Sequence, residues 1–230
     1  MEKYLLLVFS SFHVFSDPTN LREEEYRICY EQLIRLKQSN FDICFVDNTT
    51  DSIDSIKNKK LKELLNNNKY ILYDNNIGVI NKGLGELHML KNSSELINFD
   101  EFKYIGYLTG RRLVICSYIF DKMMSLQKQS LISNPPIIRV CDGNVSLPTK
   151  NLYNDMFFAM NPETIKKYIQ FAIPFLDGII DNIGSEQILY RFINQNNISY
   201  EWMDALGFIR NDWNSSSSVY NTDYKNFQFC

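Results

Sequence analysis

The stretch 75–112 determines how the rest of the chain can be arranged. It contains the polar segments Asn75-Asn76-Ile77-Gly78 and Asn81-Lys82-Gly83-Leu84-Gly85-Glu86, and it ends in Thr109-Gly110-Arg111-Arg112. A strand-like run at 70–73 precedes the first polar segment, and a second at 104–108 precedes Thr109. Loops at the ends of neighbouring parallel strands form a crevice at the carboxyl edge of a sheet, where open α/β folds bind ligands.

The residue types in these loops suit a phosphate group. Gly83 and Gly85 lack a side chain, so the backbone can approach a ligand closely there. Lys82 and Arg111 can contact phosphate oxygens, lysine as a point charge and arginine through its planar fork. If strand alternation continues past the turn, Arg112 points away from Arg111, so we expect only one of the two arginines to contact phosphate.

Length and composition limit the classes of protein that fit. The chain has 230 residues, enough for one large domain, and its 16 phenylalanines and 14 tyrosines can fill a substantial core. The formal net charge is -3 and the basic residues are dispersed, so binding to nucleic acid is not expected. Five cysteines without Cys-x-x-Cys spacing indicate neither a zinc site nor a disulfide framework, and favour a reducing compartment.

The N-terminal run 4–10 is better explained as a buried strand than as a signal peptide, because its apolar part is short and no small-residue cleavage site follows. No stretch approaches the roughly 20 apolar residues of a membrane span. We therefore expect a soluble protein in the cytoplasm, or in the host cytoplasm if the protein is viral. A peripheral association with a membrane stays open.

The order of the expected elements predicts an α/β fold. Helical patterns at 23–39, 53–65 and 83–96 follow the strands at 4–10, 41–46 and 70–73, which is typical of a parallel sheet with crossover helices. The N-terminal half is therefore Rossmann-like, in a mostly parallel central sheet flanked by helices. After residue 102 the pattern changes to short strands, such as 157–160, and to helices at 117–127, 161–172 and 184–194.

Three motifs occur at matching positions after the first three strands. They are Phe9-Ser10-Ser11, then Val46-Asp47-Asn48-Thr49-Thr50-Asp51-Ser52, then Asn76-Ile77-Gly78 with Asn81-Lys82-Gly83. In this order and spacing the sequence resembles a nucleotide-sugar glycosyltransferase of the A-type fold (GT-A). The Asn-Lys-Gly-x-Gly-Glu segment and the Thr-Gly-Arg strand end also resemble a set of bacterial and large-virus transferases.

The resemblance implies a donor site and a division of the chain. Asp47 would meet the base or ribose, and the rest of the donor site would comprise Phe9, Ser10, Ser11, Asn48, Asn76, Lys82, Gly83, Gly85, Thr109, Gly110 and Arg111. Residues 1–230 would form a single glycosyltransferase-like domain. Its nucleotide-binding half would be 1–112, its acceptor-side half 113–212, and residues 213–230 a tail or linker, with further domains of a longer chain left open.

One departure from the family concerns the metal ion. Most GT-A enzymes have Asp-x-Asp at the end of the fourth strand, where it holds Mn²⁺ or Mg²⁺ on the diphosphate. This chain has Thr109-Gly110-Arg111 instead. Either Arg111 and Lys82 neutralise the diphosphate, which we favour, or Asp142 or Asp155 binds the ion.

Two acidic residues are candidates for the general base of an inverting transfer. Glu186 begins a late helix, although it would also complement that helix's N-terminus without any catalytic role. Asp155 is the second candidate. Alternatively, Asp155 is a surface residue of an edge strand without a catalytic role. His13 follows the first strand and either lines the nucleotide pocket or is an ordinary loop residue. His88 is expected to be packed or half-exposed, with a catalytic role as the less favoured alternative.

The sequence therefore predicts an enzyme that transfers a sugar from a UDP- or GDP-type donor to a glycan or another hydroxyl acceptor. A catalytically degenerate module that binds a nucleotide sugar or a glycan is the alternative. A nucleotidyltransferase fits less well, because no glycine-rich basic loop follows the first strand. A dehydrogenase is disfavoured, because His88 stands where a third glycine would be needed.

Overall fold

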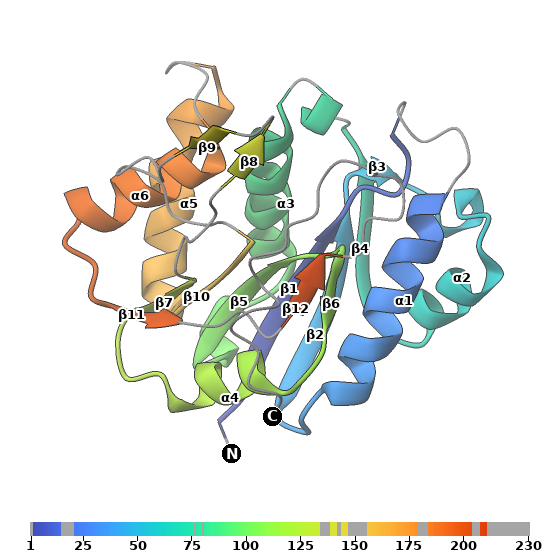
Figure 1. The fold of residues 1–230 in the computed structure, drawn as a ribbon, viewed down its shortest axis with the longest axis horizontal. Helices are drawn as coiled ribbons and strands as arrows, with labels where there is room; N and C mark the ends of the chain where they lie inside the picture. Colours follow the sequence, from blue (N-terminus) through green and yellow to red (C-terminus); the bar gives the residue numbers. More distant parts are fainter. Residues whose placement is uncertain are drawn as a thin grey trace.

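The structure is a computed structural model that describes residues 2–14, 21–75, 77–79, 81–133, 139–141, 144–146, 156–178, 184–203 and 208–210. An eight-stranded sheet has the strand order β11-β7-β10-β5-β1-β2-β4-β3. Its central strands β5, β1, β2 and β4 are parallel (Figure 1). The predicted fold class, a mostly parallel central sheet flanked by helices, is confirmed.

The strands of this sheet come from both predicted halves of the chain. The parallel strands are β1 (Tyr4–Ser10), β2 (Phe41–Asp47), β4 (Lys69–Asp74) and β5 (Tyr104–Thr109). At one edge, β3 (Thr49–Thr50) is antiparallel to β4. On the other side, β10 (Phe157–Met160) runs antiparallel between β5 and β7 (Ser130–Ser133), and β11 (Tyr200–Met203) is parallel to β7.

Helices cover both faces of the sheet. One core cluster includes side chains of α1 (Leu21–Leu36), α2 (Lys59–Asn66) and α4 (Tyr118–Ser125). The other includes side chains of α3 (Lys82–Leu96), α5 (Pro162–Leu176) and α6 (Ser185–Gln195). Strand β1 lies between the two, with Leu6 and Val8 in the first cluster and Leu5, Leu7 and Phe9 in the second. Burial on both faces explains why this strand is continuously apolar.

Three short helices and two strand pairs complete the described elements. The short helices are η1 (Ile53–Ser55), η2 (Ile77–Val79) and η3 (Phe99–Glu101). The antiparallel pairs are β6 (Arg112–Val114) with β12 (Phe208–Arg210), and β8 (Arg139–Cys141) with β9 (Asn144–Ser146).

Two helix predictions differ from the structure in informative ways. The helix expected at 53–65 is divided into η1 and α2, because Asn58 caps α2 by accepting a hydrogen bond from the backbone of Leu61. The helix expected to end near residue 172 continues to Leu176 through Pro174. Its buried face, which includes Ala172 and Phe175, packs into the core, and this packing outweighs the hydrogen bond that proline removes.

Candidate functional site

The ends of the central strands bring the predicted site residues to one edge of the sheet. Because β1, β2, β4 and β5 are parallel, their carboxyl ends lie together at the upper edge in Figure 1. The strand register pairs Phe9 with Val46 on one side and with Thr109 on the other, and it pairs Ser10 with Asp47. The N-terminal turn of α3 follows β4 at the same edge.

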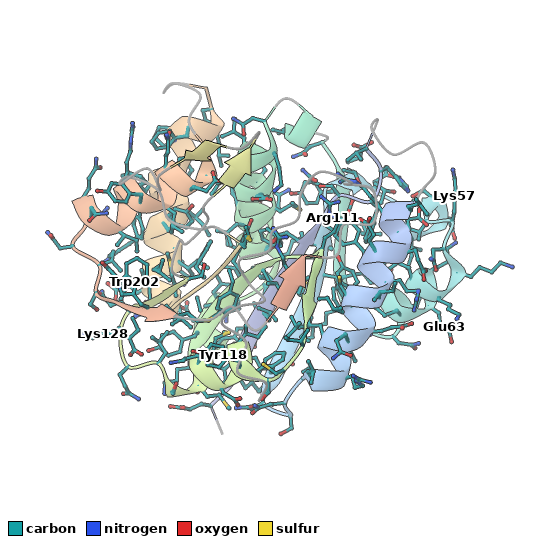
Figure 2. The ribbon with its side chains drawn as sticks, in the orientation of Figure 1. Lys57, Glu63, Arg111, Tyr118, Lys128 and Trp202 are labelled. Atoms are coloured by element: carbon teal, nitrogen blue, oxygen red, sulfur yellow. The ribbon has the colours of Figure 1, made fainter. Side chains whose placement is uncertain are left out.

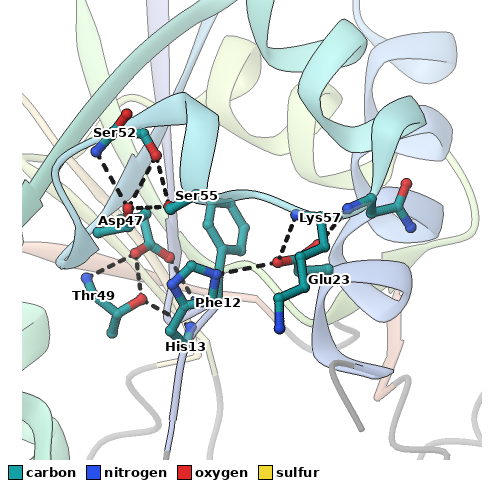
Figure 3. Close-up of polar contacts among 10 residues, drawn as sticks. Phe12, His13, Glu23, Asp47, Thr49, Ser52, Ser55 and Lys57 are labelled. Carbon is teal, nitrogen blue, oxygen red and sulfur yellow. Dashed lines mark hydrogen bonds and ion pairs between the residues drawn. The ribbon is translucent and has the colours of Figure 1, made fainter.

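Asp47 is completely buried and joins the loops that follow β1 and β2 (Figure 3). Its Oδ2 accepts a hydrogen bond from the backbone N–H of Phe12 at 2.8 Å. Its Oδ1 accepts from the backbone N–H and the hydroxyl of Thr49, at 2.8 and 2.6 Å. The Thr49 hydroxyl in turn accepts from the backbone N–H of His13. Both carboxylate oxygens are thus directed at the protein, where they hold the two loops together.

Burial raises the pKa of Asp47, and the hydrogen bonds from Thr49, Phe12 and Ser10 oppose that rise. A carboxyl group removed from water is costly in its charged form, so it needs several donors to stay there. Asp47 has donors from two different loops. We conclude that this residue fixes the relative positions of the loops that follow β1 and β2.

The residues at the end of β1 are held mainly through their backbone and hydroxyl groups. Ser10 Oγ donates to the carbonyl of Val46 at 3.0 Å. The Ser11 N–H donates to the Tyr26 hydroxyl, and its carbonyl accepts from Arg22 Nη1. The ring of Phe9 lies in the core, in edge contact with Tyr107 at a centroid distance of 4.8 Å. Ser11 is therefore the most accessible of the three predicted residues here.

Asn48 links the end of β2 to the segment before α3. Its Nδ2 donates to Asn75 Oδ1 at 3.3 Å, while its buried Oδ1 has no hydrogen-bond partner among the described residues. A Cβ on Gly85 would lie 2.8 Å from Gly78 Cα and 3.3 Å from Asn48 Nδ2. Gly85 thus permits this close packing. The close approach that its missing side chain allows is made by Gly78 and Asn48 of the protein itself. Asn76 lies outside the described residues.

The first turn of α3 carries Lys82 and faces the start of α6. Lys82 Nζ lies 3.3 Å from Glu86 Oε1, and the Tyr107 hydroxyl donates to Glu86 Oε2 at 2.7 Å. A Cβ on Gly83 would lie 2.8 Å from the backbone nitrogen of Ser185, so this glycine allows α3 and α6 to meet. The N-termini of both helices, where partial positive charge concentrates, therefore lie side by side.

The Thr-Gly-Arg turn directs its two arginines to different partners. Arg111 Nη1 lies 3.3 Å from Glu25 Oε2 of α1, and Figure 2 shows Arg111 near the upper ends of the central strands. Arg112 is buried, and its Nε donates to the Thr109 hydroxyl at 3.1 Å. The Gly110 N–H donates to the carbonyl of Phe9 at 2.6 Å, which ties the turn to β1.

Of the three candidate acids, Glu186 is the one among the residues that the structure describes. Glu186 lies in the first turn of α6, and its Oε2 would lie 2.7 Å from a Cβ added to Gly184, so the carboxylate curls back over the start of its own helix. Asp142 and Asp155 lie outside the described residues. Among the residues that are described, no three His, Cys, Asp or Glu side chains form a group suited to a metal ion. Metal binding by Asp142 or Asp155 stays a prediction.

Three buried acids at this edge were not singled out from the sequence. Glu23 and Glu25 of α1 are only 1% and 2% exposed. Glu86 lies inside the quoted glycine motif and is 7% exposed. The available signal was the run of three consecutive glutamates at 23–25, because a helix that packs on a sheet cannot direct all three into solvent.

The fold is similar to that of solved transferases. A 4-diphosphocytidyl-2C-methyl-D-erythritol synthase from Anaerococcus prevotii DSM 20548 matches with a TM-score of 0.54 and 12% identity over 91% of this chain and 92% of that one. A protein named as a nucleotide-diphospho-sugar transferase from Desulfovibrio desulfuricans G20 matches with a TM-score of 0.53 and 10% identity, over 88% and 80%. The galactosyltransferase LgtC matches with a TM-score of 0.51 and 9% identity, over 85% and 72%.

The chain has a GT-A-like fold. At these identities the similarity concerns the fold alone, and no protein-family model and no curated protein sequence matches the chain. In this GT-A-like fold, none of the described helices is both long and apolar enough to cross a membrane.

Proposed function

We propose that this protein is a glycosyltransferase that moves a sugar from a UDP- or GDP-type donor to a glycan or another hydroxyl acceptor. The observation that carries the proposal is the convergence of the β1 loop, the end of β2, the start of α3 and the Thr-Gly-Arg turn at one edge of the sheet. In an open α/β fold, this edge is the usual place for a ligand. The GT-A-like fold agrees with this choice of substrate.

In this proposal the donor diphosphate lies between the start of α3 and the end of β5. Lys82 and Arg111 are the cations there, and each already faces a carboxylate, Glu86 and Glu25 respectively. The adjoining N-termini of α3 and α6 add partial positive charge. As the sugar leaves, negative charge grows on the diphosphate, and fixed positive groups stabilise it.

The acceptor hydroxyl needs a base if the transfer inverts the sugar configuration. Glu186 is the described candidate, because α6 begins beside Gly83 and so beside the proposed diphosphate position. Asp155 is the second candidate. If a Mn²⁺ or Mg²⁺ ion takes part, Asp142 or Asp155 would hold it and it would share the charge of the diphosphate with Lys82 and Arg111.

A nucleotidyltransferase is the second candidate function. It is favoured by the similarity to the diphosphocytidyl-methylerythritol synthase, which covers 91% of this chain. The loop after β1 argues against it, since residues 11–14 are Ser-Phe-His-Val and contain no glycine. The reaction products distinguish the two: a glycosyltransferase releases a nucleoside diphosphate, and a nucleotidyltransferase releases pyrophosphate from a triphosphate.

The test is thermal stabilisation by UDP, GDP, CMP, CTP and the sugar nucleotides, each with Mn²⁺ and with a chelator. A ligand at 100 times its Kd should add about 2.7 kcal/mol to the free energy of unfolding. We expect a nucleoside diphosphate to stabilise the wild type and to stabilise Arg111→Ala far less. Arg27→Ala is the matched control, because Arg27 pairs with Glu24 and Glu31 along α1 instead of lying at the strand ends.

No stabilisation by any nucleotide would overturn the proposal. Stabilisation by CTP with pyrophosphate release would identify a nucleotidyltransferase. Binding of a diphosphate without hydrolysis or transfer of its sugar, across a panel of glycan acceptors, would instead identify a non-catalytic binding module. Loss of the effect in the chelator would show that the ion is needed in addition to Arg111.

A further inference from the structure

His13 and Glu23 form a pair beside the proposed donor site, and the function proposed above gives neither residue a role. His13 Nε2 lies 3.1 Å from Glu23 Oε1 (Figure 3). We propose that His13 contacts the nucleoside part of the donor and that Glu23 positions its ring. This inference rests on the proposed function, because it assumes a nucleotide at the carboxyl edge.

The carboxylate of Glu23 is buried and held by hydrogen bonds. Its side chain is 1% exposed, and its two oxygens accept hydrogen bonds from three groups. Oε1 accepts from the backbone N–H of Lys57 at 3.2 Å in addition to facing His13, and Oε2 accepts from the backbone N–H of Asn58 at 2.6 Å. A buried carboxylate held by backbone donors has little freedom to move. It therefore provides a fixed point for the imidazole ring.

The ring of His13 is accessible where Glu23 is not. The side chain of His13 is 31% exposed. An ionised carboxylate only accepts, so Glu23 places the imidazole proton on Nε2. Nδ1 forms no hydrogen bond with any residue that the structure describes. In the neutral ring, Nδ1 is then an acceptor, which suits a ribose hydroxyl or a base N–H.

The backbone around His13 is held from several directions. Its own N–H donates to the Thr49 hydroxyl, which Asp47 holds in turn. One residue earlier, the N–H of Phe12 donates directly to Asp47. Arg22 Nη1 donates to the carbonyl of Ser11. A loop ordered before binding loses less conformational freedom when a ligand arrives, so more of the contact energy appears as affinity.

The location of His13 and Glu23 favours a contact with the nucleoside part of the donor over a contact with its diphosphate. His13 contacts Thr49 of β3 and Glu23 of α1, on the β2 side of strand β1. The proposed diphosphate cations form a second group. Lys82 begins α3, which packs on the opposite face of the sheet from α1, and Arg111 follows β5, which lies on the other side of β1 from β2. A nucleotide whose phosphates lie at the second group extends its ribose or base towards the first.

The test compares two ligands on four proteins. The Kd values of the stabilising nucleoside diphosphate and of inorganic pyrophosphate are measured by calorimetry for the wild type, His13→Ala, Glu23→Gln and the double variant. We expect His13→Ala to weaken the nucleoside diphosphate roughly tenfold, about the value of one hydrogen bond, and to leave pyrophosphate within about twofold. Glu23→Gln should weaken the same ligand selectively, and the double variant should bind like His13→Ala.

Controls separate positioning from loss of structure. Glu24→Gln removes the neighbouring, 45% exposed acid and should change neither Kd. Nitrogen-15 spectra of the wild-type imidazole should show the proton on Nε2, and nucleotide binding should shift the Nδ1 signal. If Glu23→Gln does not fold, His13→Ala still decides, because it removes a partly exposed ring and leaves the buried carboxylate with its backbone donors.

Two results would overturn the inference while the proposed function survives. They are an unchanged nucleoside diphosphate Kd in His13→Ala, and an equal loss for both ligands, which would indicate a general change in the loop. If the wild type binds pyrophosphate but no nucleoside diphosphate, or neither ligand, the proposed function fails and the inference fails with it.

Discussion

The two sides of the carboxyl edge use buried carboxylates differently. On the β1–β2 side, Asp47 and Glu23 mainly accept hydrogen bonds from backbone N–H groups of the surrounding loops. On the α3–β5 side, Glu86 and Glu25 face the cationic side chains of Lys82 and Arg111. Backbone donors cannot leave without changing the fold, whereas a lysine or arginine side chain can change partners by rotating.

This difference suggests a division of labour within the proposed donor site. The β1–β2 side provides a wall whose shape is fixed by the carboxylates in its core. The α3–β5 side provides charge on side chains that remain partly accessible, 76% for Lys82 and 21% for Arg111. Removing the buried Asp47 on the first side should therefore mainly change stability, whereas removing an accessible side chain, Lys82 or Arg111 on the second side or His13 on the first, should mainly change affinity.

The largest effect is expected from Asp47→Ala. The change leaves the buried N–H groups of Phe12 and Thr49 without their acceptor, and it should lower the free energy of unfolding by about 3 kcal/mol. Urea denaturation measures the loss. Asp51→Ala is the control in the same loop, because Asp51 is exposed, and it should stay within about 0.5 kcal/mol of the wild type.

The stability difference between the wild type and Asp47→Ala should depend on pH, and this dependence tests whether Asp47 is buried as described. Burial raises the pKa of Asp47, so the folded chain binds this proton more tightly than the unfolded chain does. The stabilisation is complete below the ordinary carboxyl pKa and declines as the pH rises through the raised pKa. The stability gap between wild type and Asp47→Ala should therefore narrow as the pH increases. A gap that widens would contradict the role of burial.

A smaller effect is expected where the two sides of the edge meet, at Gly85. In Gly85→Ala the new methyl group would lie 2.8 Å from Gly78 Cα, a backbone atom, so η2 must move away from α3. We expect a loss of about 1–2 kcal/mol, since the better helix propensity of alanine offsets part of the overpacking. Thermal unfolding measures it.

Gly78→Ala is the matched control, because a Cβ at that position meets no atom within 4 Å. It should change the free energy of unfolding by less than about 0.5 kcal/mol. Equal losses in the two variants would show that a general demand for glycine in this segment, and not the contact with α3, explains the result.

The fold was predictable where the local pattern and the tertiary environment agree. Strand β1 is buried on both faces, and a continuous apolar run is the direct consequence. Strands β7 and β11 were not predicted. In β7, Ser130 and Ser133 are buried because their hydroxyls donate to the carbonyls of Ser199 and Phe157, which are distant in sequence. No local pattern encodes such partners.

The candidate site was predictable at the level of segments and less so at the level of side chains. The quoted loops do converge, because parallel strands end at a common edge. Glu23 and Glu25 became visible only in the structure. Residues two apart on a helix point in nearly opposite directions, so one acid reaches His13 and the other Arg111. The ligand-binding roles assigned from the sequence stay predictions.

The smallest effect on stability, with a clear effect on affinity, is expected from Lys82→Met. The ion pair with Glu86 spans one helical turn and Lys82 is 76% exposed, so the free energy of unfolding should change by less than about 0.5 kcal/mol. The Kd for a nucleoside diphosphate should rise about tenfold, because a charged contact to phosphate is lost. Lys91→Met removes a similar pair, with Glu95, further along the same helix and should leave the Kd unchanged. Equal affinities of the two variants would place the diphosphate away from α3. Of the two proposed cations, Arg111 would then be the one that binds it.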